Sequence, residues 1–406
     1  MSLNQAEVIV AGHICLDIIP TIPNRNVSTD ALLVPGKLVD IGEAIISTGG
    51  AVSNTGIALH RLGSPVKLMG KIGNDLFGKA IIDVLESHSP LLAEGMIVAE
   101  GEASSYSIVI SPPGVDRIFL HCTGTNDTYS AKDISFEQLD SAKLFHFGYP
   151  PLMRCMYENE GEGLVDLLRQ AKERGVTVSL DMAKPDPESP AGQVHWRTIL
   201  NKALPHVDIF LPSFEEILYM LYPEVYTSFI ERAGSNDILH LVDGSILSMI
   251  SDDLLAMGAA VVGLKLGEHG LYVRTSPNAN AIAGMGRCAP EEANIQAWCN
   301  QELLANCYQV KVAGTTGAGD CTIAGFLAAM LRGVTIEEAL RFAVGVGACN
   351  VEKSDATSGV PTWDEVQARI NEGWDHRSLT LSLPSWRAIG AGLWAESGRE
   401  EGNRDE

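Results

Sequence analysis

A carboxylate, Asp320, directly follows the glycine-rich turn Gly317-Ala318-Gly319 and precedes the helical stretch CTIAGFLAAML. Amides at the start of a helix bind anions, because their N–H groups point outward at the positive end of the helix dipole. A P-loop would have Lys and then Ser or Thr where this chain has Asp320 and Cys321. A carboxylate there suits a different task, which is to accept a proton from a hydroxyl while the amides stabilise a transferring phosphoryl group. The simpler alternative is that Asp320 only caps the helix.

Polar groups near the N-terminus have the types and spacing to bind hydroxyls. Gly49 and Gly50, in TGGAVSNTG, would let the backbone approach a ligand closely, and Asn54 offers both a donor and an acceptor. Asp17 follows the first predicted strand and Gly12, where its carboxylate could accept hydrogen bonds from two sugar hydroxyls. A structural turn at the glycines and an Asx-turn at Asp17 are the alternatives.

These elements occur in an order that resembles the PfkB-type, ribokinase-like carbohydrate kinases. The G-x-x-x-x-D element matches Gly12 to Asp17, and the G-G-x-x-x-N element matches the glycine pair and Asn54. KIGNDLFGK resembles the family's G-x-D-x-x-G segment, and GTNDTYSAKDI resembles its G-A-N loop. GTTGAGD matches the closing signature D-T-T-G-A-G-D at six of seven positions, and the resemblance covers roughly residues 7–370. Each element is weak alone, but their order and spacing together are specific.

The resemblance implies ATP-dependent phosphorylation of a sugar hydroxymethyl group with Mg²⁺. It assigns Asp320 as the catalytic base and the amides of Gly317, Ala318 and Gly319 as the anion hole. It also implies that four residues near the N-terminus hold the sugar, namely Asp17, Gly49, Gly50 and Asn54. A β-rich hairpin at 103–122 would act as a lid that excludes water and limits wasteful ATP hydrolysis.

Two positions depart from the family pattern. Gly314 stands where the signature usually has Asp, a residue that often helps to hold a monovalent cation, so potassium activation is in doubt. The family's N-x-x-E motif, which organises Mg²⁺ and phosphates, appears as SFEE. Ser213 replaces the Asn, and Glu216 keeps the acid as the predicted metal-organising group. We therefore expect retained phosphoryl transfer with an altered metal dependence.

The same resemblance places ATP-binding residues in the C-terminal half of the chain. Lys265 could neutralise phosphate, although a solvated lysine at a strand end is an equal alternative. Asn350 and Val351 fall where the family tends to line the adenine pocket. The predicted nucleotide-binding set is Ser213, Lys265, Gly267, Thr315 and Asn350.

The elements that must position these residues alternate between strand and helix. Runs such as VTVSLDMA and VDIFLP are nearly all apolar and are separated by helical segments, which favours a doubly wound, mostly parallel α/β sheet flanked by helices. We expect one ribokinase-like domain over 1–375, with lid segments at about 14–46 and 100–125 and an irregular insertion at about 277–310. Residues 376–406 are predicted to be a tail with an unstructured end. Lids of this kind often pair between subunits, which makes a homodimer through the lid a further expectation.

The composition disfavours several classes of partner. The formal net charge of −22 argues against nucleic acid and anionic membrane surfaces, and no apolar run approaches the roughly 20 residues of a membrane span. None of the eight cysteines forms a C-x-x-C pair, which favours reduced thiols in a cytoplasmic protein. His13, His121, His146 and His269 lack metal-ligand spacing, so the sequence predicts no shared histidine metal site.

Three other functions compete with that of a sugar kinase. A nucleoside kinase on the same fold needs an apolar or aromatic clamp for the base, and the hairpin supplies only Tyr106 and Phe119. A non-catalytic sugar-binding or regulatory protein would explain the changes at Gly314 and Ser213, whereas the intact G-A-G-D argues against it. A dinucleotide-dependent oxidoreductase fails because no G-x-G-x-x-G follows the first strand. Pentoses, ketohexoses, deoxy-sugar acids and nucleosides all stay open as acceptors.

Overall fold

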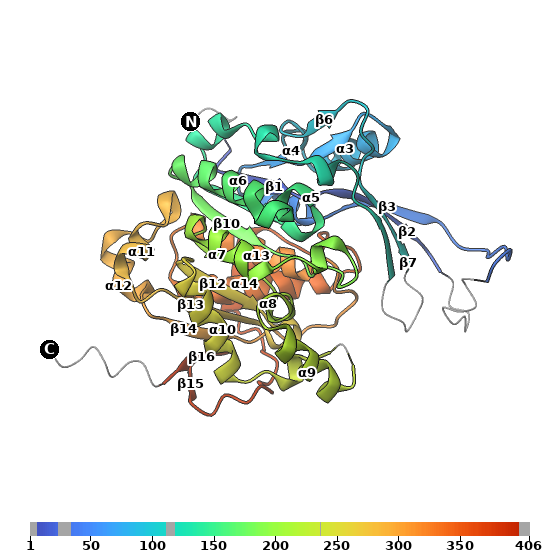
Figure 1. Cartoon of the computed structure of the whole chain (residues 1–406). Coiled ribbons are helices and arrows are strands. Elements are labelled where there is room, and N and C mark those ends of the chain that lie inside the picture. The colour runs from blue at the N-terminus through green and yellow to red at the C-terminus, as the bar shows by residue number, and fades with distance from the viewer. Residues whose placement is uncertain (1–5, 23–33, 111–117, 236, 398–406) are drawn as a thin grey trace.

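The body of the protein is built on a ten-stranded sheet (Figure 1). The computed structural model describes residues 6–22, 34–110, 118–235 and 237–397 of the chain. The parallel part of the sheet confirms the prediction from apolar strands and contains, in spatial order, β4 (Val66–Met69), β1 (Val8–Gly12), β9 (Leu144–Gly148), β10 (Thr177–Asp181), β11 (Ile209–Phe210) and β12 (Val261–Lys265). The sheet continues through antiparallel strands, which are β13 (Leu271–Thr275), β14 (Glu302–Ala305), β16 (Leu393–Glu396) and β15 (Trp386–Gly390).

Helices cover both faces of this sheet, and each face has its own apolar core. Alternate residues of β1 point to opposite faces, so Val8 and Val10 join one core while Ile9 and Ala11 join the other. The first core also takes side chains from α2 (Ala51–Arg61), α3 (Leu76–His88), α4 (Pro90–Ala93), α11 (Ala279–Ala283), α12 (Ile295–Trp298), α13 (Ala318–Leu331), α14 (Ile336–Val351) and α15 (Trp363–Asn371). The second takes side chains from α5 (Arg154–Tyr157), α6 (Glu162–Glu173), α7 (Trp196–Ala203), α8 (Phe214–Leu221), α9 (Pro223–Ala233) and α10 (Gly244–Ala256). Across the described ranges, no helix combines the length and apolar character needed to cross a membrane.

A second sheet forms the predicted lid and extends outward from the body in Figure 1. Its strands, in spatial order, are β3 (Ala44–Gly49), β2 (Cys15–Pro20), β7 (Tyr106–Ile110) and β8 (Ile118–Cys122). A short pair, β5 (Lys71–Gly73) and β6 (Ile97–Ala99), is separate. Residues 23–33 and 111–117, which fall in the predicted lid segments, lie outside the described residues.

The lid has one polar and one apolar side near its base. Strand register places four polar residues in one cross-strand row, the polar row, which consists of Ser47, Asp17, Ser107 and His121. The next row along the strands is apolar and consists of Ile46, Ile18, Ile108 and Leu120. Successive rows of a sheet face opposite sides, so the polar row and the apolar row lie on different faces of the lid.

The chain passes from the body to the lid directly after β1. Gly12 has a φ of 122°, and a Cβ there would lie 2.3 Å from the carbonyl oxygen of Gly148 in the neighbouring strand β9. Glycine meets both demands, because it tolerates positive φ and has no Cβ. Asn126 then fixes the crossing, since its side chain accepts a hydrogen bond from the amide of Ile14 (3.2 Å) and donates one to the carbonyl of Ile14 (2.9 Å). The base of the lid is therefore held firmly to β1.

Two segments differ from the sequence-based expectations. Residues 277–310, expected to be irregular, include two short helices, α11 and α12, and strand β14 of the main sheet. The prediction of a tail over 376–406 is wrong for β15 and β16. Strand β16 pairs with β14, and β15 pairs with β16, so both extend the main sheet. The pairing covers the open edge that β14 would otherwise present, and it buries Trp386 and Leu393. The predicted unstructured end begins at Glu396, which instead ends β16, and its residues 398–406 lie outside the described residues.

Candidate active site

Asp320 lies in the first turn of α13 and faces α2. The Asn54 side chain donates from Nδ2 to Asp320 Oδ2 at 2.9 Å, and the Tyr149 hydroxyl donates to Oδ1 at 2.8 Å. The N-cap position of α13 belongs to Gly317, so the alternative in which Asp320 caps the helix is wrong. The carboxylate is instead buried and held by two neutral donors.

The surroundings of Asp320 adjust its basicity. Burial raises the pKa of this carboxyl above its usual value, while the hydrogen bond from Asn54, the Lys265 ammonium and the hydrogen bond from Tyr149 act in the opposite direction. Burial and the Asp320 charge raise the pKa of Tyr149 well above its usual value, so this phenol keeps its proton and donates it. A carboxylate with a raised pKa accepts a proton more readily. The arrangement therefore suits proton abstraction from a hydroxyl.

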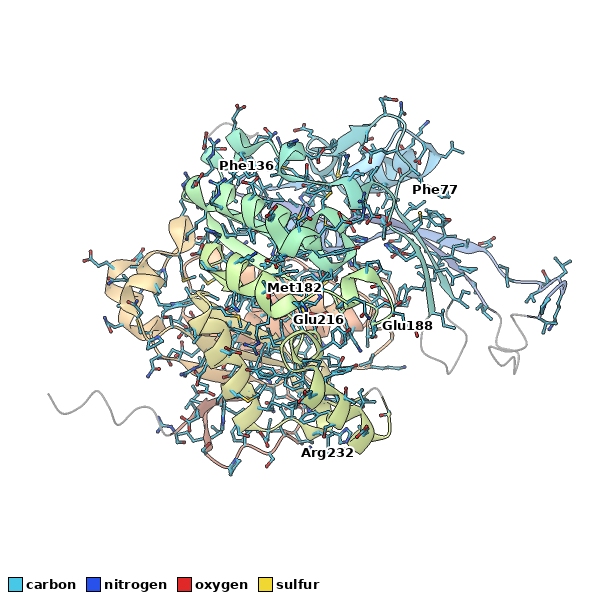
Figure 2. The ribbon with its side chains drawn as sticks, viewed as in Figure 1. Phe77, Phe136, Met182, Glu188, Glu216 and Arg232 are labelled. Carbon is cyan, nitrogen blue, oxygen red and sulfur yellow. The ribbon has the colours of Figure 1, made fainter. Side chains whose placement is uncertain are left out.

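A charged cluster lies beside the predicted anion hole. Lys265, at the end of β12, pairs with Asp181, at the end of β10, with Nζ and Oδ1 2.6 Å apart and both side chains buried. The alternative of a solvated lysine is therefore wrong. A Cβ on Gly319 would lie 3.5 Å from Lys265 Cδ and Cε, which places the ammonium next to the start of α13. Glu216 of α8 lies near the centre of the molecule (Figure 2) and accepts a hydrogen bond from the Ser213 amide at 2.7 Å.

Three carboxyls interact with the ammonium of Lys265, and two of them, Asp181 and Asp320, are buried. Burial raises the pKa of Asp181 to about 8, and it also raises the pKa values of Glu216 and Asp320. Burial lowers the pKa of Lys265, but the neighbouring carboxylates outweigh this effect and raise it. Asp181 Oδ2 is buried without a hydrogen-bond partner among the described residues. The unpartnered Asp181 Oδ2 and the nearby Glu216 carboxylate are oxygen donors of the kind that suits Mg²⁺, so these residues fit the metal that the resemblance implies.

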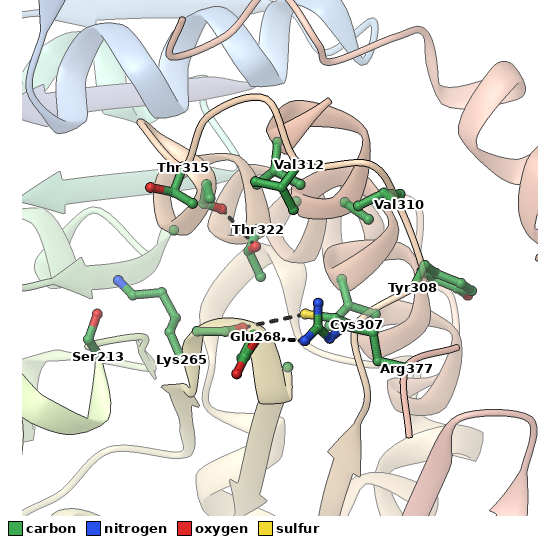
Figure 3. A pocket seen from close by; sticks show the side chains of 18 residues that line it. Ser213, Lys265, Glu268, Cys307, Tyr308, Val310, Val312, Thr315, Thr322 and Arg377 are labelled. Atoms are coloured by element: carbon green, nitrogen blue, oxygen red, sulfur yellow. Dashed lines mark hydrogen bonds and ion pairs between the residues drawn. The ribbon is translucent and has the colours of Figure 1, made fainter. Parts of the chain in front are cut away.

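A cavity of about 330 Å³ opens beside this cluster (Figure 3). Ser213, Lys265 and the first turn of α13 line one end of it. Much of its remaining wall is apolar and comes from Tyr308, Val310, Val312, Val344, Ala348 and Val351. Arg377, which forms an ion pair with Glu268, also lines the cavity. A positively charged end and an apolar slot suit the phosphates and the base of a nucleotide.

The cavity contains four of the five predicted nucleotide-binding residues, which are Ser213, Lys265, Gly267 and Thr315. Asn350 does not line it. This side chain is fully buried in α14 and donates to the carbonyl of Thr316 at 2.9 Å, so it supports the glycine-rich loop from behind. The physical reason is helical phase, because the next residue, Val351, faces the cavity instead.

The predicted sugar-binding residues gather where the lid meets the body. Asp17 lies within β2 and not in an Asx-turn, and a Cβ on Gly49 would approach its Oδ2 to 2.3 Å. Gly50 is the N-cap residue of α2, and Asn54 in the same helix contacts Asp320. Asn54 Oδ1 is buried without a hydrogen-bond partner among the described residues, so an acceptor is available next to Asp320. The structure thus brings together all four residues.

The contact between Gly49 and Asp17 yields a test of sugar binding. We expect Gly49→Ala to raise the KM for the sugar at least ~10-fold, because the new Cβ would displace the Asp17 carboxylate, and a lost bond to a charged group costs about 1.5–3 kcal/mol. The KM for ATP should change little. Steady-state kinetics of Gly49→Ala, Asp17→Ala and the double variant check the cause. The double variant should be no worse than Asp17→Ala, and additive losses would contradict the steric explanation.

Sequence reasoning missed two residues of this site. Tyr149 directly follows β9 and has a φ of 66°, which is uncommon for a residue other than glycine. Asp181 ends β10, and the sequence assigned it no role. Both are polar residues at the carboxyl end of a parallel strand, the edge at which open α/β sheets bind ligands. That rule, applied to each predicted strand, would have found them.

Known proteins share this architecture. The profile of the pfkB family of carbohydrate kinases matches residues 5–240 and 251–363. An uncharacterised sugar kinase of Archaeoglobus fulgidus is 27% identical over 305 residues, which cover 75% of this chain and 98% of that protein. Fructokinase-2 of Solanum lycopersicum is 23% identical over 386 residues, which cover 92% and 100%.

The solved structures agree on the fold. Arabidopsis thaliana ribokinase, solved with ribose and ATP, superposes with a TM-score of 0.65 at 18% identity, covering 90% of this chain and 98% of that chain. The fold is thus ribokinase-like, with a mostly parallel sheet between helices and a small sheet as lid. Since the family profile also covers most of the sequence, the chain belongs to the pfkB family of carbohydrate kinases.

Proposed function

We propose that this kinase transfers the γ-phosphoryl group of ATP to a hydroxymethyl group of a small free sugar. The observation that carries the proposal is the position of Asp320. Its carboxylate touches Asn54 on the side where the lid meets the body, and it belongs to the helix turn that lines the nucleotide cavity. A sugar hydroxyl beside Asp320 would thus lie next to a phosphate at the start of α13. The fructokinase and the ribose-bound ribokinase among its relatives agree with a sugar acceptor.

The proton side of the reaction depends on three residues. Asp320 accepts the proton of the attacking hydroxyl late in a loose transition state, so its pKa needs only a modest rise. Asn54 and Tyr149 fix the direction of the carboxylate through their bonds to its two oxygens. The accepting oxygens of the carboxylate are therefore oriented before the substrate arrives.

Residues of the body would stabilise the phosphoryl group during its transfer. The amides of Gly317, Ala318 and Gly319 lie at the N-terminal end of α13, where they stabilise charge on the transferring phosphoryl group. Lys265 adds a positive charge at the same place. Asp181 and Glu216 would hold Mg²⁺, and the metal when bound supplies further charge neutralisation.

The lid favours a sugar over a nucleoside. Its polar row (Ser47, Asp17, Ser107 and His121) offers donors and acceptors for hydroxyls. Tyr106, one of the two aromatic residues that could clamp a base, packs instead against Phe77 of α3 with ring centroids 5.0 Å apart. The intact contacts of Asp320 speak against a non-catalytic regulatory role.

ADP release from ATP and Mg²⁺ tests the proposed function. The full chain is incubated separately with pentoses, ketohexoses, deoxy-sugar acids and nucleosides. We expect one free sugar to give the highest kcat/KM. Turnover with nucleosides alone would replace the proposal with a nucleoside kinase. ATP binding without turnover across the panel would favour the regulatory alternative.

Potassium should not be needed for turnover. A Cβ at Gly314 would lie 2.9 Å from Ser354 Cα and 3.0 Å from its carbonyl oxygen, so the loop has no room for the aspartate of the D-T-T-G-A-G-D signature. We expect kcat in potassium chloride to match that in sodium chloride or choline chloride at equal ionic strength. A several-fold activation by potassium alone would show that other groups replace the missing carboxylate.

The apolar row of the lid should pair with a second lid. Ile46 is 48% exposed and Leu120 is 52% exposed, on the face opposite Asp17. Exposed apolar sheet faces of this kind are unusual on a monomer. We therefore expect light scattering to give twice the 43.5 kDa of one chain, and Ile46→Ser/Leu120→Ser to give a monomer. A monomeric wild-type protein at micromolar concentration would contradict the pairing.

A further inference from the structure

Three side chains with metal-binding atoms meet at the base of the lid, although the sequence predicted no such group. His13 belongs to the crossing between β1 and β2, Cys15 begins β2, and His121 lies in β8 on the polar row. One ligand atom from each residue lies within 4.8 Å of the others. We call these three residues the His-Cys-His cluster. The first two are buried and His121 is exposed, so solvent reaches the cluster from one side.

The separation of the two imidazole nitrogens resembles that around a metal more than that of a hydrogen bond. Nε2 of His13 and Nε2 of His121 are 3.4 Å apart, which is long for a hydrogen bond. Two nitrogens bound to one tetrahedral zinc ion at 2.0–2.1 Å would be separated by roughly 3.3 Å. The imidazoles therefore need little movement to share an ion.

The surroundings of the cluster affect the protonation of its two imidazoles and its thiol. Nδ1 of His121 lies 2.9 Å from the Ser107 hydroxyl, and a bond donated there would leave the lone pair of Nε2 facing His13. Burial lowers the pKa of His13 to about 3 and also lowers that of His121, so both rings are neutral at physiological pH. Burial raises the pKa of Cys15, so metal binding must displace its thiol proton. Sγ of Cys15 also lies 3.4 Å from Oδ1 of Asp17.

We propose that the His-Cys-His cluster binds a zinc ion that links the lid to the body. Two imidazoles and one thiolate are donors that zinc prefers over magnesium, and the set leaves a fourth position for water or the Asp17 carboxylate. Because Asp17 and Ser107 belong to the proposed sugar site, a bound ion occupies or blocks that site. Zinc is then an inhibitor that competes with the sugar and not with ATP.

Cobalt(II) spectroscopy tests the site without any assay of activity. Untagged, reduced full chain is first freed of metal with a chelator and then titrated with Co²⁺, with Zn²⁺ added afterwards to displace it. We expect one equivalent to produce thiolate-to-cobalt absorption, and zinc to abolish it. Cys15→Ser should remove the absorption, and His121→Gln should weaken binding at least ~10-fold. Cys122→Ser is the matched control, because this thiol neighbours His121 but points to the opposite face of β8.

The outcomes separate this proposal from the proposed kinase function. Absence of the absorption, or equal binding by wild type, Cys15→Ser and His121→Gln, overturns the zinc site. His121→Gln is the decisive variant if Cys15→Ser fails to fold, since His121 is exposed. With the accepted sugar, zinc should raise the KM for sugar in wild type and not in His121→Gln. Inhibition that competes with ATP instead would contradict a site on the lid.

Discussion

Asp320→Asn is expected to lower kcat by roughly 10²–10⁴-fold, the range that a general base contributes. Asparagine keeps the shape of the side chain and can still bond to both Asn54 and Tyr149, because its oxygen accepts and its amide donates. It cannot take up the proton of the attacking hydroxyl. The KM for ATP should stay within a few-fold of the wild-type value. The measurement is ADP release under saturating substrates, together with thermal unfolding.

Thermal unfolding supplies the control. The folded-state pKa of Asp320 lies above its unfolded value, so its ionisation destabilises the fold as the pH rises between those values. Removing the carboxyl removes that cost, and the variant should therefore unfold at the same temperature as wild type or higher. Near-normal kcat in a folded variant would refute the assignment of Asp320 as the base. A lower Tm would instead point to a structural role.

The pH dependence of kcat in Tyr149→Phe tests Asp320 as the proton acceptor. The hydrogen bond from Tyr149 lowers the pKa of Asp320, so its loss should raise that pKa further. The acid limb of the kcat profile should then move to higher pH, since the base is protonated over a wider range. A fall in kcat without any shift in the profile would mean that Tyr149 acts on the substrate and not through Asp320.

The second large effect is expected from Lys265→Met, in both activity and stability. Loss of the ammonium should lower kcat at least ~10²-fold, as removal of one stabilising donor at a developing charge commonly does. It also leaves Asp181, Glu216 and Asp320 without their shared cation. Removing one partner of a buried ion pair costs about 3–5 kcal/mol of unfolding free energy. Urea unfolding at neutral pH measures this loss.

The pH dependence of that loss follows from the carboxyls. Their pKa values are already raised by burial, and loss of the lysine raises them further. A group with a raised folded-state pKa destabilises the fold increasingly as the pH rises above its unfolded pKa. The variant should therefore lose about 1.4 kcal/mol per pH unit for each carboxyl that stays protonated only in the folded state. It should come closest to wild type below pH 5.

A double variant distinguishes the contribution of the Lys265 charge to stability from that of its packing. Lys265→Met/Asp181→Asn removes both members of the ion pair and should recover much of the stability lost in Lys265→Met. It should recover none of the activity, because the positive charge at the start of α13 is still missing. Equal stability of the single and double variants would show that the lysine contributes mainly through its aliphatic stem.

The sequence predicted the body of the fold well, because apolar periodicity and glycine turns are local signals. The run VTVSLD became β10, and Asp75, in the segment KIGNDLFGK, caps α3 through the amide of Gly78. Asp320 and Asn54, which were both assigned to the site, also contact each other. The strand follows from local sequence, whereas Asp320 and Asn54 are 266 positions apart and were placed in one site by the family resemblance.

Other features depend on contacts between distant segments. Asn350 was assigned by its place in a motif, whereas helical phase turns it away from the cavity. Trp386 and Leu393 looked like part of a tail, because no local pattern reveals that β14 offers an open edge. His13 and His121 are 108 positions apart, and only strand register brings them together. The register between distant strands cannot be predicted from any short stretch of sequence.

The polar row of the lid has a consequence for how such an enzyme can change. Each of the four lid strands contributes a hydroxyl, a carboxylate or an imidazole to this row, while the body alone lines the cavity proposed for the nucleotide. In this arrangement the lid selects the acceptor and the body binds ATP, so mutations can change one without changing the other. If the proposed sugar site holds, a few substitutions on the short strands of the lid can redirect the enzyme to a new sugar, and the buried machinery for phosphoryl transfer can be inherited unchanged.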